Sequence, residues 1–208
     1  MLYDSTIQPA TLVLLKQLMT MPGLEKFALV GGTALALRFG HRISVDLDLF
    51  SMNDFKNEEL IAVLENKFDN FTYRNPNNPI GVFGFIDGIK VDFVRHHQFK
   101  MIDAIQSEDG IRMFSDKDII AMKINAILKR AVKKDFWDIA ELLDHYSVND
   151  FVEFYYSKYP SQMLLISIPY ALTSFEDAET SDMPVSLKKQ TWGKVKKIIQ
   201  KKVSEYLS

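Results

Sequence analysis

Apolar residues change their spacing along this chain, and the change divides it into two parts. The first part carries short apolar runs with β-branched and aromatic residues between turn residues, a pattern that predicts strands. The predicted strands cover residues 27–30, 45–50, 71–74, 81–86 and 89–95. Asp87-Gly88 separates the last two runs and predicts a tight hairpin turn between them.

Apolar residues at helical spacing predict the other elements. In the first part the predicted helices cover residues 11–19, 33–39 and 57–68, and the first of them starts near Pro9. From Ser115, which with Asp118 resembles a helix-capping pair, the pattern is helical. These later helices are predicted at residues 118–130, 134–146, 148–159, 162–172 and 187–207. The chain is therefore predicted to form an α/β domain over residues 1–112 and a helical subdomain over residues 113–208.

Two acids alternate with apolar residues in the predicted strand 45–50. Because the side chains of a strand alternate between its faces, Asp46 and Asp48 point the same way, while Val45, Leu47 and Leu49 point into a core. Carboxylates on one face repel each other unless a positive charge lies between them. Mg²⁺, which prefers hard oxygen ligands, is the simplest such charge. The alternative is a surface strand with two solvated acids.

A third acid, Asp92, lies among β-branched and aromatic residues in the predicted strand 89–95. An acid in a buried strand is costly unless it is paired or bound to a metal. Taken alone, Asp92 is better placed on the solvent face of an edge strand. Together with Asp46 and Asp48 it favours a metal site made of three carboxylates.

Two adjacent glycines, Gly31 and Gly32, separate the predicted strand 27–30 from the short helix that follows. Glycine lets the backbone turn tightly and approach a ligand closely. The N-terminus of a helix beside glycines can bind an anion, and a triphosphate suits such a position. Glycine pairs alone usually mark only a turn, so this interpretation depends on the aspartates that follow.

Composition and charge narrow the classes of function. The chain has 208 residues and a net charge of −2, so any contact with nucleic acid must use local basic patches. Cysteine is absent, which excludes disulfides and thiolate metal sites. Residues 1–11 lack the pattern of a secretory signal, and no apolar run is long enough to span a membrane. We therefore expect a soluble cytoplasmic protein without a membrane partner.

The motifs resemble a known family. The segments GGTAL at residues 31–35 and RISVDLDLF at residues 42–50, with the later strand around Asp92, resemble the AbiEii toxin family and its MenT-like relatives, within the DNA polymerase β-type nucleotidyltransferase superfamily. The segments KDFWD at 134–138 and FEDAE at 175–179 also resemble family members. The resemblance implies a nucleotidyltransferase-fold mixed sheet with flanking helices and a C-terminal helical subdomain. Many superfamily members have serine where this chain has Gly32, so a hydroxyl contact to phosphate at that position is missing.

The resemblance also implies an activity and a set of site residues. It implies transfer of a nucleoside monophosphate from an NTP to an acceptor hydroxyl, with two Mg²⁺ ions. The family's site positions match Ser44, Asp46, Lys123 and Asp138. With the other two acids, the expected catalytic residues are Asp46, Asp48, Asp92, Lys123 and Asp138, and we expect the three acids Asp46, Asp48 and Asp92 to be the metal ligands. The nucleotide-binding residues are Gly31, Gly32, Thr33, Ser44, Lys123 and Arg130. Lys123 would place its charge on the triphosphate, and Asp138 would orient Lys123 or the acceptor.

Simpler interpretations exist for several of these side chains. Lys123 can be a solvated helix lysine, Asp138 can pair with Lys134, Arg130 can pair with Asp135, and Ser44 can be a loop cap. The histidines His41, His96 and His97 lack partners at the spacing of a zinc site and are expected in solvated loops. For an RNA acceptor, the basic cluster 129–134 is a better candidate than the lysines of 187–207.

The expected biological role is that of a toxin in a toxin–antitoxin or phage-defence system, with RNA, tRNA in some relatives, as the acceptor and a cognate antitoxin as partner. Two other functions fit the same sequence. One is a nucleotidyltransferase that modifies a small molecule such as an antibiotic. The other is an inactive module that only binds nucleotide, which the presence of all three carboxylates disfavours.

Overall fold

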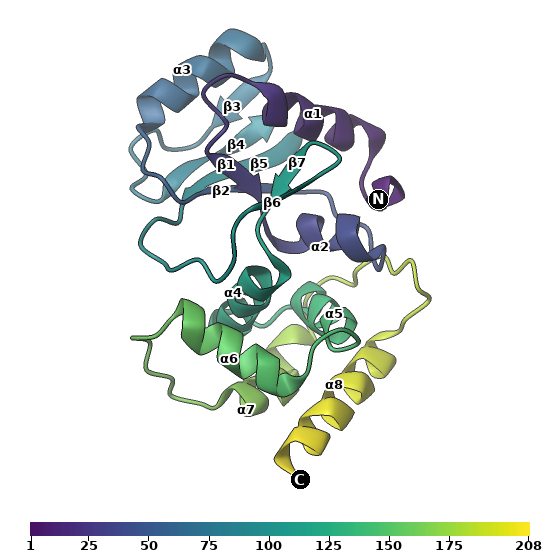
Figure 1. Ribbon diagram of the computed structural model, residues 1–208. Coiled ribbons are helices and arrows are strands. Elements are labelled where there is room, and N and C mark those ends of the chain that lie inside the picture. Colours follow the sequence, from purple (N-terminus) through teal and green to yellow (C-terminus); the bar gives the residue numbers. More distant parts are fainter. The chain divides into compact units, whose positions relative to one another are not determined.

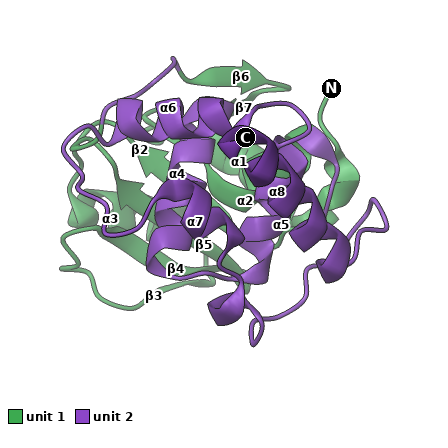
Figure 2. Cartoon of the chain, turned by 90° about the horizontal axis from the view of Figure 1, so that it is seen from below, with its two compact units in different colours: residues 1–38, 44–99, 105–114 green, residues 39–43, 100–104, 115–208 purple.

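The computed structural model describes all 208 residues and divides into two compact units (Figure 2). Unit 1 contains residues 1–38, 44–99 and 105–114, and unit 2 contains residues 39–43, 100–104 and 115–208. Two short segments of the first half, 39–43 and 100–104, are thus grouped with the helical unit. None of the helices has the length and the apolar character needed to cross a membrane.

Unit 1 is built on a seven-stranded mixed sheet with the strand order β3-β4-β5-β2-β1-β7-β6 (Figure 1). The strands are β1 (Phe27–Leu29), β2 (Leu47–Ser51), β3 (Phe71–Tyr73), β4 (Gly81–Ile86), β5 (Ile89–Arg95), β6 (Gln106–Glu108) and β7 (Ile111–Met113). β2 is antiparallel to β1 and parallel to β5, and β1 is parallel to β7. β5 therefore lies inside the sheet, between β4 and β2.

The helical elements of unit 1 are η1 (Asp4–Thr6), α1 (Pro9–Thr20), α2 (Gly31–Phe39) and α3 (Asn57–Lys67). Pro9 opens α1, because proline fixes a helical φ where no N–H is needed. Figure 1 shows α1 and α3 on one side of the sheet. Phe27, Phe55 and Phe93 form a buried cluster, with Phe27 at 5.0 Å from Phe55 and 5.2 Å from Phe93 between ring centroids.

The strand predictions are confirmed at the β4–β5 hairpin, where Asp87 and Gly88 both adopt positive φ. One hairpin was not predicted: β6 and β7 pair across Asp109-Gly110, which also have positive φ. The expected domain boundary near residue 112 thus falls in β7. The predicted strand 45–50 was placed too early, since β2 begins at Leu47, and Val45 is 54% exposed rather than in the core.

Unit 2 is helical. Its elements are α4 (Asp116–Lys129), α5 (Lys133–Leu142), α6 (Val148–Lys158), α7 (Ile168–Thr173), η2 (Glu176–Ala178) and α8 (Trp192–Leu207). Ser115 caps α4 as predicted, because its hydroxyl accepts a hydrogen bond from the Asp118 amide. The Asp118 carboxylate is also paired with the buried Lys158 ammonium at 2.8 Å, which joins α4 to α6.

The core of unit 2 contains an aromatic cluster around Trp192, which stacks on Trp137 with ring centroids 6.1 Å apart. Three helix predictions are too long, and the first of them, 134–146, ends at Leu142. The segment 162–172 is helical only from Ile168, and the apolar side chains Met163 and Leu165 are exposed. The last helix starts at Trp192, not at residue 187, because the Thr191 hydroxyl caps it there.

Candidate active site

Two of the predicted acids lie side by side on the sheet of unit 1. Asp48 on β2 and Asp92 on β5 are register partners on neighbouring parallel strands, so their side chains share one face. Asp92 is 7% exposed, and its Oδ1 atom is buried without a hydrogen-bond partner. The edge-strand alternative for Asp92 is wrong, because β4 and β2 flank β5. A buried carboxylate oxygen without a partner is costly, which indicates a place for a cation or a donor.

A lysine on the same face partly neutralises these acids. The Lys90 ammonium lies 2.7 Å from Asp92 Oδ2. Burial opposes the charge of this ammonium, but the hydrogen bond to Asp92 and the negative charges of Asp92, Asp48 and Asp46 outweigh burial and raise the pKa of Lys90. The three acids thus act on one cation that the chain itself supplies, and Lys90 was not among the residues that the sequence motifs singled out.

Gly31 brings the backbone against Asp48. Its φ is +70°, and a Cβ at this position would lie 3.1 Å from Asp48 Oδ2. A side chain here would be strained by the positive φ and would press on the carboxylate. α2 starts at Gly31, so the free amides of its first turn lie next to the first acid of the sheet. Glycine is therefore required here for a close approach between the helix N-terminus and Asp48.

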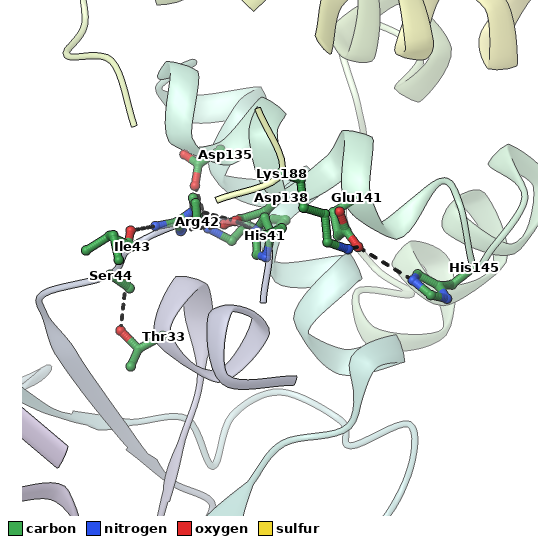
Figure 3. Close-up of polar contacts among 11 residues, drawn as sticks. Thr33, His41, Arg42, Ile43, Ser44, Asp135, Asp138, Glu141, His145 and Lys188 are labelled. Carbon is green, nitrogen blue, oxygen red and sulfur yellow. Dashed lines mark hydrogen bonds and ion pairs between the residues drawn. The ribbon is translucent and has the colours of Figure 1, made fainter. Parts of the chain in front are cut away.

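Thr33 and Ser44 fix the segment that carries Asp46. The Thr33 hydroxyl donates to the Asp46 carbonyl at 2.5 Å. It accepts from the Ser44 hydroxyl at 2.8 Å (Figure 3). Both side chains are buried. Asp46 itself lies just before β2 and is partly exposed. The two hydroxyls hold the backbone of this acid, whereas their contact with a nucleotide stays a prediction.

Two of the three predicted acids, Asp48 and Asp92, fit a hard cation. No three His, Asp or Glu side chains lie close enough together to hold one metal ion. Mg²⁺ in phosphate-handling sites is commonly held by one or two carboxylates, with the remaining ligands supplied by phosphates and water. Asp48 and Asp92, with the unpartnered Asp92 Oδ1, meet that requirement. That Asp46 is a third metal ligand stays a prediction.

A variant of Lys90 tests the proposed cation site without an activity assay. We expect Lys90→Gln to lower the thermal midpoint in EDTA by roughly 2–4 °C, because a half-exposed ion pair contributes up to about 1 kcal/mol. Mg²⁺ should then raise the midpoint more in Lys90→Gln than in wild type, because the competing ammonium is gone. Thermal shift over a MgCl₂ titration measures both effects, with Lys56→Gln as the control. Identical Mg²⁺ responses of Lys90→Gln and wild type would contradict the prediction.

A second group of predicted residues forms a buried ionic network in unit 2. Asp138 is fully buried and accepts hydrogen bonds from Arg42 Nε at 2.7 Å, Arg42 Nη2 at 2.9 Å and His41 Nε2 at 2.7 Å (Figure 3). Its Oδ2 atom also lies 2.6 Å from the Lys123 ammonium. Asp138 thus holds the 39–43 segment to α5 and contacts Lys123, as one predicted role for Asp138 requires.

Charge balance in this network depends on Lys123. Burial disfavours its ammonium, but the negative charges of Asp135 and Asp138 outweigh burial and raise the pKa of Lys123. Burial likewise opposes the Asp138 carboxylate, while Arg42 and Lys123 hold its pKa well below the usual range. The interpretation of Lys123 as a solvated lysine is wrong, since it is 7% exposed. Its contact with a triphosphate stays a prediction.

The other polar positions differ from their expectations. His41 and His96 are buried rather than solvated. Arg130 lies just past the end of α4, is exposed and forms no ion pair. The expected Arg130–Asp135 pair is replaced by a Lys123–Asp135 pair at 2.7 Å. No periodic pattern marks His41 and Arg42, because they lie in a short loop and their partner Asp138 is about a hundred residues away.

Comparison with known proteins places the chain among nucleotidyltransferases. An uncharacterised protein of Aquifex aeolicus is 29% identical over 188 residues, which cover 87% of this chain and 88% of the relative. The structure is similar to MenT4, a nucleotidyltransferase toxin of Mycobacterium tuberculosis, with a TM-score of 0.55 and 14% identity, covering 93% of this chain and 82% of MenT4. It is also similar to the antibiotic-resistance factor ANT(2'')-Ia, with a TM-score of 0.53 and 17% identity, covering 71% of this chain and 91% of that protein.

At these identities the structural likenesses show a shared fold, and the family assignment rests on the sequence. The family described as "Nucleotidyl transferase AbiEii toxin, Type IV TA system" matches residues 13–189. The match contains the glycine pair, the acids Asp46, Asp48 and Asp92, and the network around Lys123 and Asp138. The chain therefore belongs to the AbiEii family of nucleotidyltransferase toxins and is a transferase.

Proposed function

We propose that this chain is a Mg²⁺-dependent toxin that transfers a nucleoside monophosphate from an NTP to a hydroxyl group of RNA. One observation carries the proposal most directly. Asp48 and Asp92 are in register on neighbouring strands, and Asp48 lies against Gly31 at the start of α2. A site for a hard cation and a site for phosphate amide contacts are therefore adjacent within unit 1.

The nucleotide side of the reaction is assigned to the start of α2. Amides of Gly31 and Gly32 bind the β- and γ-phosphates, since a helix N-terminus favours negative charge. Asp48 and Asp92, with Asp46 as a further ligand, would hold the two Mg²⁺ ions together with phosphate oxygens and water. When bound, these ions offset the negative charge that develops on the transferred phosphoryl and the leaving pyrophosphate. Thr33 and Ser44 keep Asp46 in place through the Asp46 carbonyl.

Asp92 is assigned to the acceptor side. Its free Oδ1 atom accepts a hydrogen bond from the acceptor hydroxyl and takes up its proton. The acceptor oxygen forms a bond to the α-phosphorus, the bond from that phosphorus to the β-phosphate oxygen breaks, and pyrophosphate leaves. Lys90 must give up its contact with Asp92 Oδ2 for that carboxylate to bind a cation fully.

The network of unit 2 supplies charge. Lys123 is assigned as a phosphate-binding charge of unit 2, and Asp138 positions Lys123 through the 2.6 Å contact. Arg130 is exposed and without an ion pair, and is therefore available for a phosphate. Membership of a type IV toxin–antitoxin family also implies a cognate antitoxin as a partner.

Transfer of label tests the proposal. The protein is incubated with each of the four α-³²P NTPs and Mg²⁺, in the presence of total RNA, purified tRNA or a panel of aminoglycosides. We expect label in RNA with at least one NTP and none without Mg²⁺. Label in an aminoglycoside alone would instead support a small-molecule transferase, a function that the likeness to ANT(2'')-Ia allows. A thermal shift with Mg²⁺ and NTP, without transfer to any acceptor, would indicate an inactive binding module.

A further inference from the structure

A pocket opens beside Asp92 on the sheet of unit 1. It has a volume of about 330 Å³ and is lined by Arg74, Asn78, Phe83, Phe85, Lys90 and Asp92, among others. Sites for small ligands range from roughly 300 to 1,000 Å³, so the pocket is large enough for one small group. Asp92 is more than nine-tenths buried and lines this pocket, and its Oδ1 atom lacks a partner.

The register of the strands places the pocket on one side of the acidic pair. Phe83 is the partner of Asp92, and Phe85 is the partner of Lys90, so both rings share the face of the acids. β4 lies beyond β5 in the strand order, whereas β1 and the glycine pair after it lie on the other side of β2. A triphosphate at the glycines would therefore leave this pocket to the acceptor.

The lining has the chemistry of a single-stranded nucleic acid site. Phe85, the last residue but one of β4, is 37% exposed and so offers its ring to a ligand. The Arg74 side chain is exposed and forms no ion pair, and its backbone is fixed by a 3.2 Å hydrogen bond to Phe83. Aromatic rings that stack bases, combined with cations that contact phosphates, are typical of such sites.

The charges of the pocket distinguish it from a site for an aminoglycoside. Two cations, Arg74 and Lys90, line it with a single acid, Asp92. Lys90 is already paired with Asp92, so Arg74 is the lining cation that has no acidic partner and can contact a phosphodiester, a contact that a polycationic antibiotic would not make. We infer that the pocket binds one nucleotide of a single-stranded RNA acceptor, with its base on Phe85, its phosphate on Arg74 and its ribose hydroxyl toward Asp92. This inference rests on the proposed function for the direction of the transfer.

Binding of RNA to pocket variants tests the inference. The probe is a fluorescein-labelled single-stranded RNA 12-mer of mixed sequence, followed by anisotropy without NTP. We expect Phe85→Leu to weaken binding about 5- to 150-fold, the effect of losing one base-stacking contact, and Phe85→Tyr, which keeps the ring, to bind like wild type. Arg74→Ala should reduce the slope of log affinity against log salt by about 0.7, the value for one phosphate contact on a single strand.

The controls separate this inference from the proposed function. Lys67→Ala removes an exposed charge from α3, outside the pocket, and should leave RNA binding unchanged. The Kd for Mg²⁺–NTP should be equal in wild type, Phe85→Leu and Arg74→Ala, because these side chains lie on the acceptor side. RNA that binds every variant equally, or that does not bind wild type, overturns the inference. RNA binding that depends on Phe85 and Arg74 but is not followed by transfer supports the pocket and contradicts the proposed function.

Discussion

Asp48→Asn is expected to reduce nucleotidyl transfer about a thousandfold while leaving the fold intact. The asparagine has nearly the same shape, so it still fits against Gly31 and beside Asp92. It lacks the negative charge that holds a cation, and losing such charge stabilisation in the transition state costs roughly 4 kcal/mol. Initial rates of label transfer from the preferred NTP measure the loss, and circular dichroism shows that the sheet is still formed.

The control for Asp48→Asn is Asp87→Asn in the β4–β5 turn. Asp87 has φ near +50°, which asparagine also tolerates, and this exposed turn lies away from the acid pair. Its activity should equal that of wild type. If the initial rate of Asp48→Asn were within a few-fold of the wild-type rate, Asp48 would not be a metal ligand. Activity that falls equally in both variants would show that the assay responds to the charge of unit 1 in general.

The acid pair was predictable because it lies in a strand, where a period of two fixes which side chains share a face. The Asp48 and Asp92 pairing follows from that period once β2 and β5 are neighbours. Lys90 obeys the same rule, since it is two residues before Asp92 and on the same face. The sequence motifs do not identify Lys90, because a lysine in a strand usually lies on the solvent face. The structure shows that three acids raise the pKa of Lys90.

The elements that were missed carry weak local patterns. β6 consists of Gln106, Ser107 and Glu108, which have no apolar alternation, although Asp109-Gly110 is the same turn signal that identified the other hairpin. The opposite error occurred before α7. Apolar side chains there suggested a helix, yet Met163 and Leu165 are exposed and no helical face is buried. Composition alone could not distinguish a buried stripe from an exposed apolar loop.

The ionic network of unit 2 could be predicted only in part. Lys123 and Asp138 were found through their family motifs, and their mutual contact agrees with the suggested orienting role. Arg42 and His41 were not, because their contacts with Asp138 join positions 96 and 97 residues apart. Sequence spacing predicts neighbours within one element, whereas such long-range polar contacts depend on how the elements pack. The network therefore has a structural role that the motifs do not reveal.

Asp138→Asn is expected to lower the free energy of unfolding of unit 2 by roughly 3–5 kcal/mol, because it leaves the buried charges of Arg42 and Lys123 without their shared carboxylate. Both tryptophans, Trp137 and Trp192, belong to unit 2, so their fluorescence reports the unfolding of this unit in urea. The control is Asp144→Asn, at an exposed position just after α5. It should change the free energy of unfolding by less than about 0.5 kcal/mol.

The pH dependence of this difference separates a charge effect from a packing effect. Burial opposes the Asp138 charge, but Arg42 and Lys123 hold its folded-state pKa well below that of an unfolded aspartate, about 3.9. A group with a depressed folded pKa stabilises the protein above its unfolded pKa and loses that contribution as the pH falls toward the folded value. The gap between wild type and Asp138→Asn should therefore be full at neutral pH and shrink below about pH 4. A gap that stays constant down to pH 3 would show that the asparagine disturbs packing, and that the charge of Asp138 is not what joins Arg42 and Lys123.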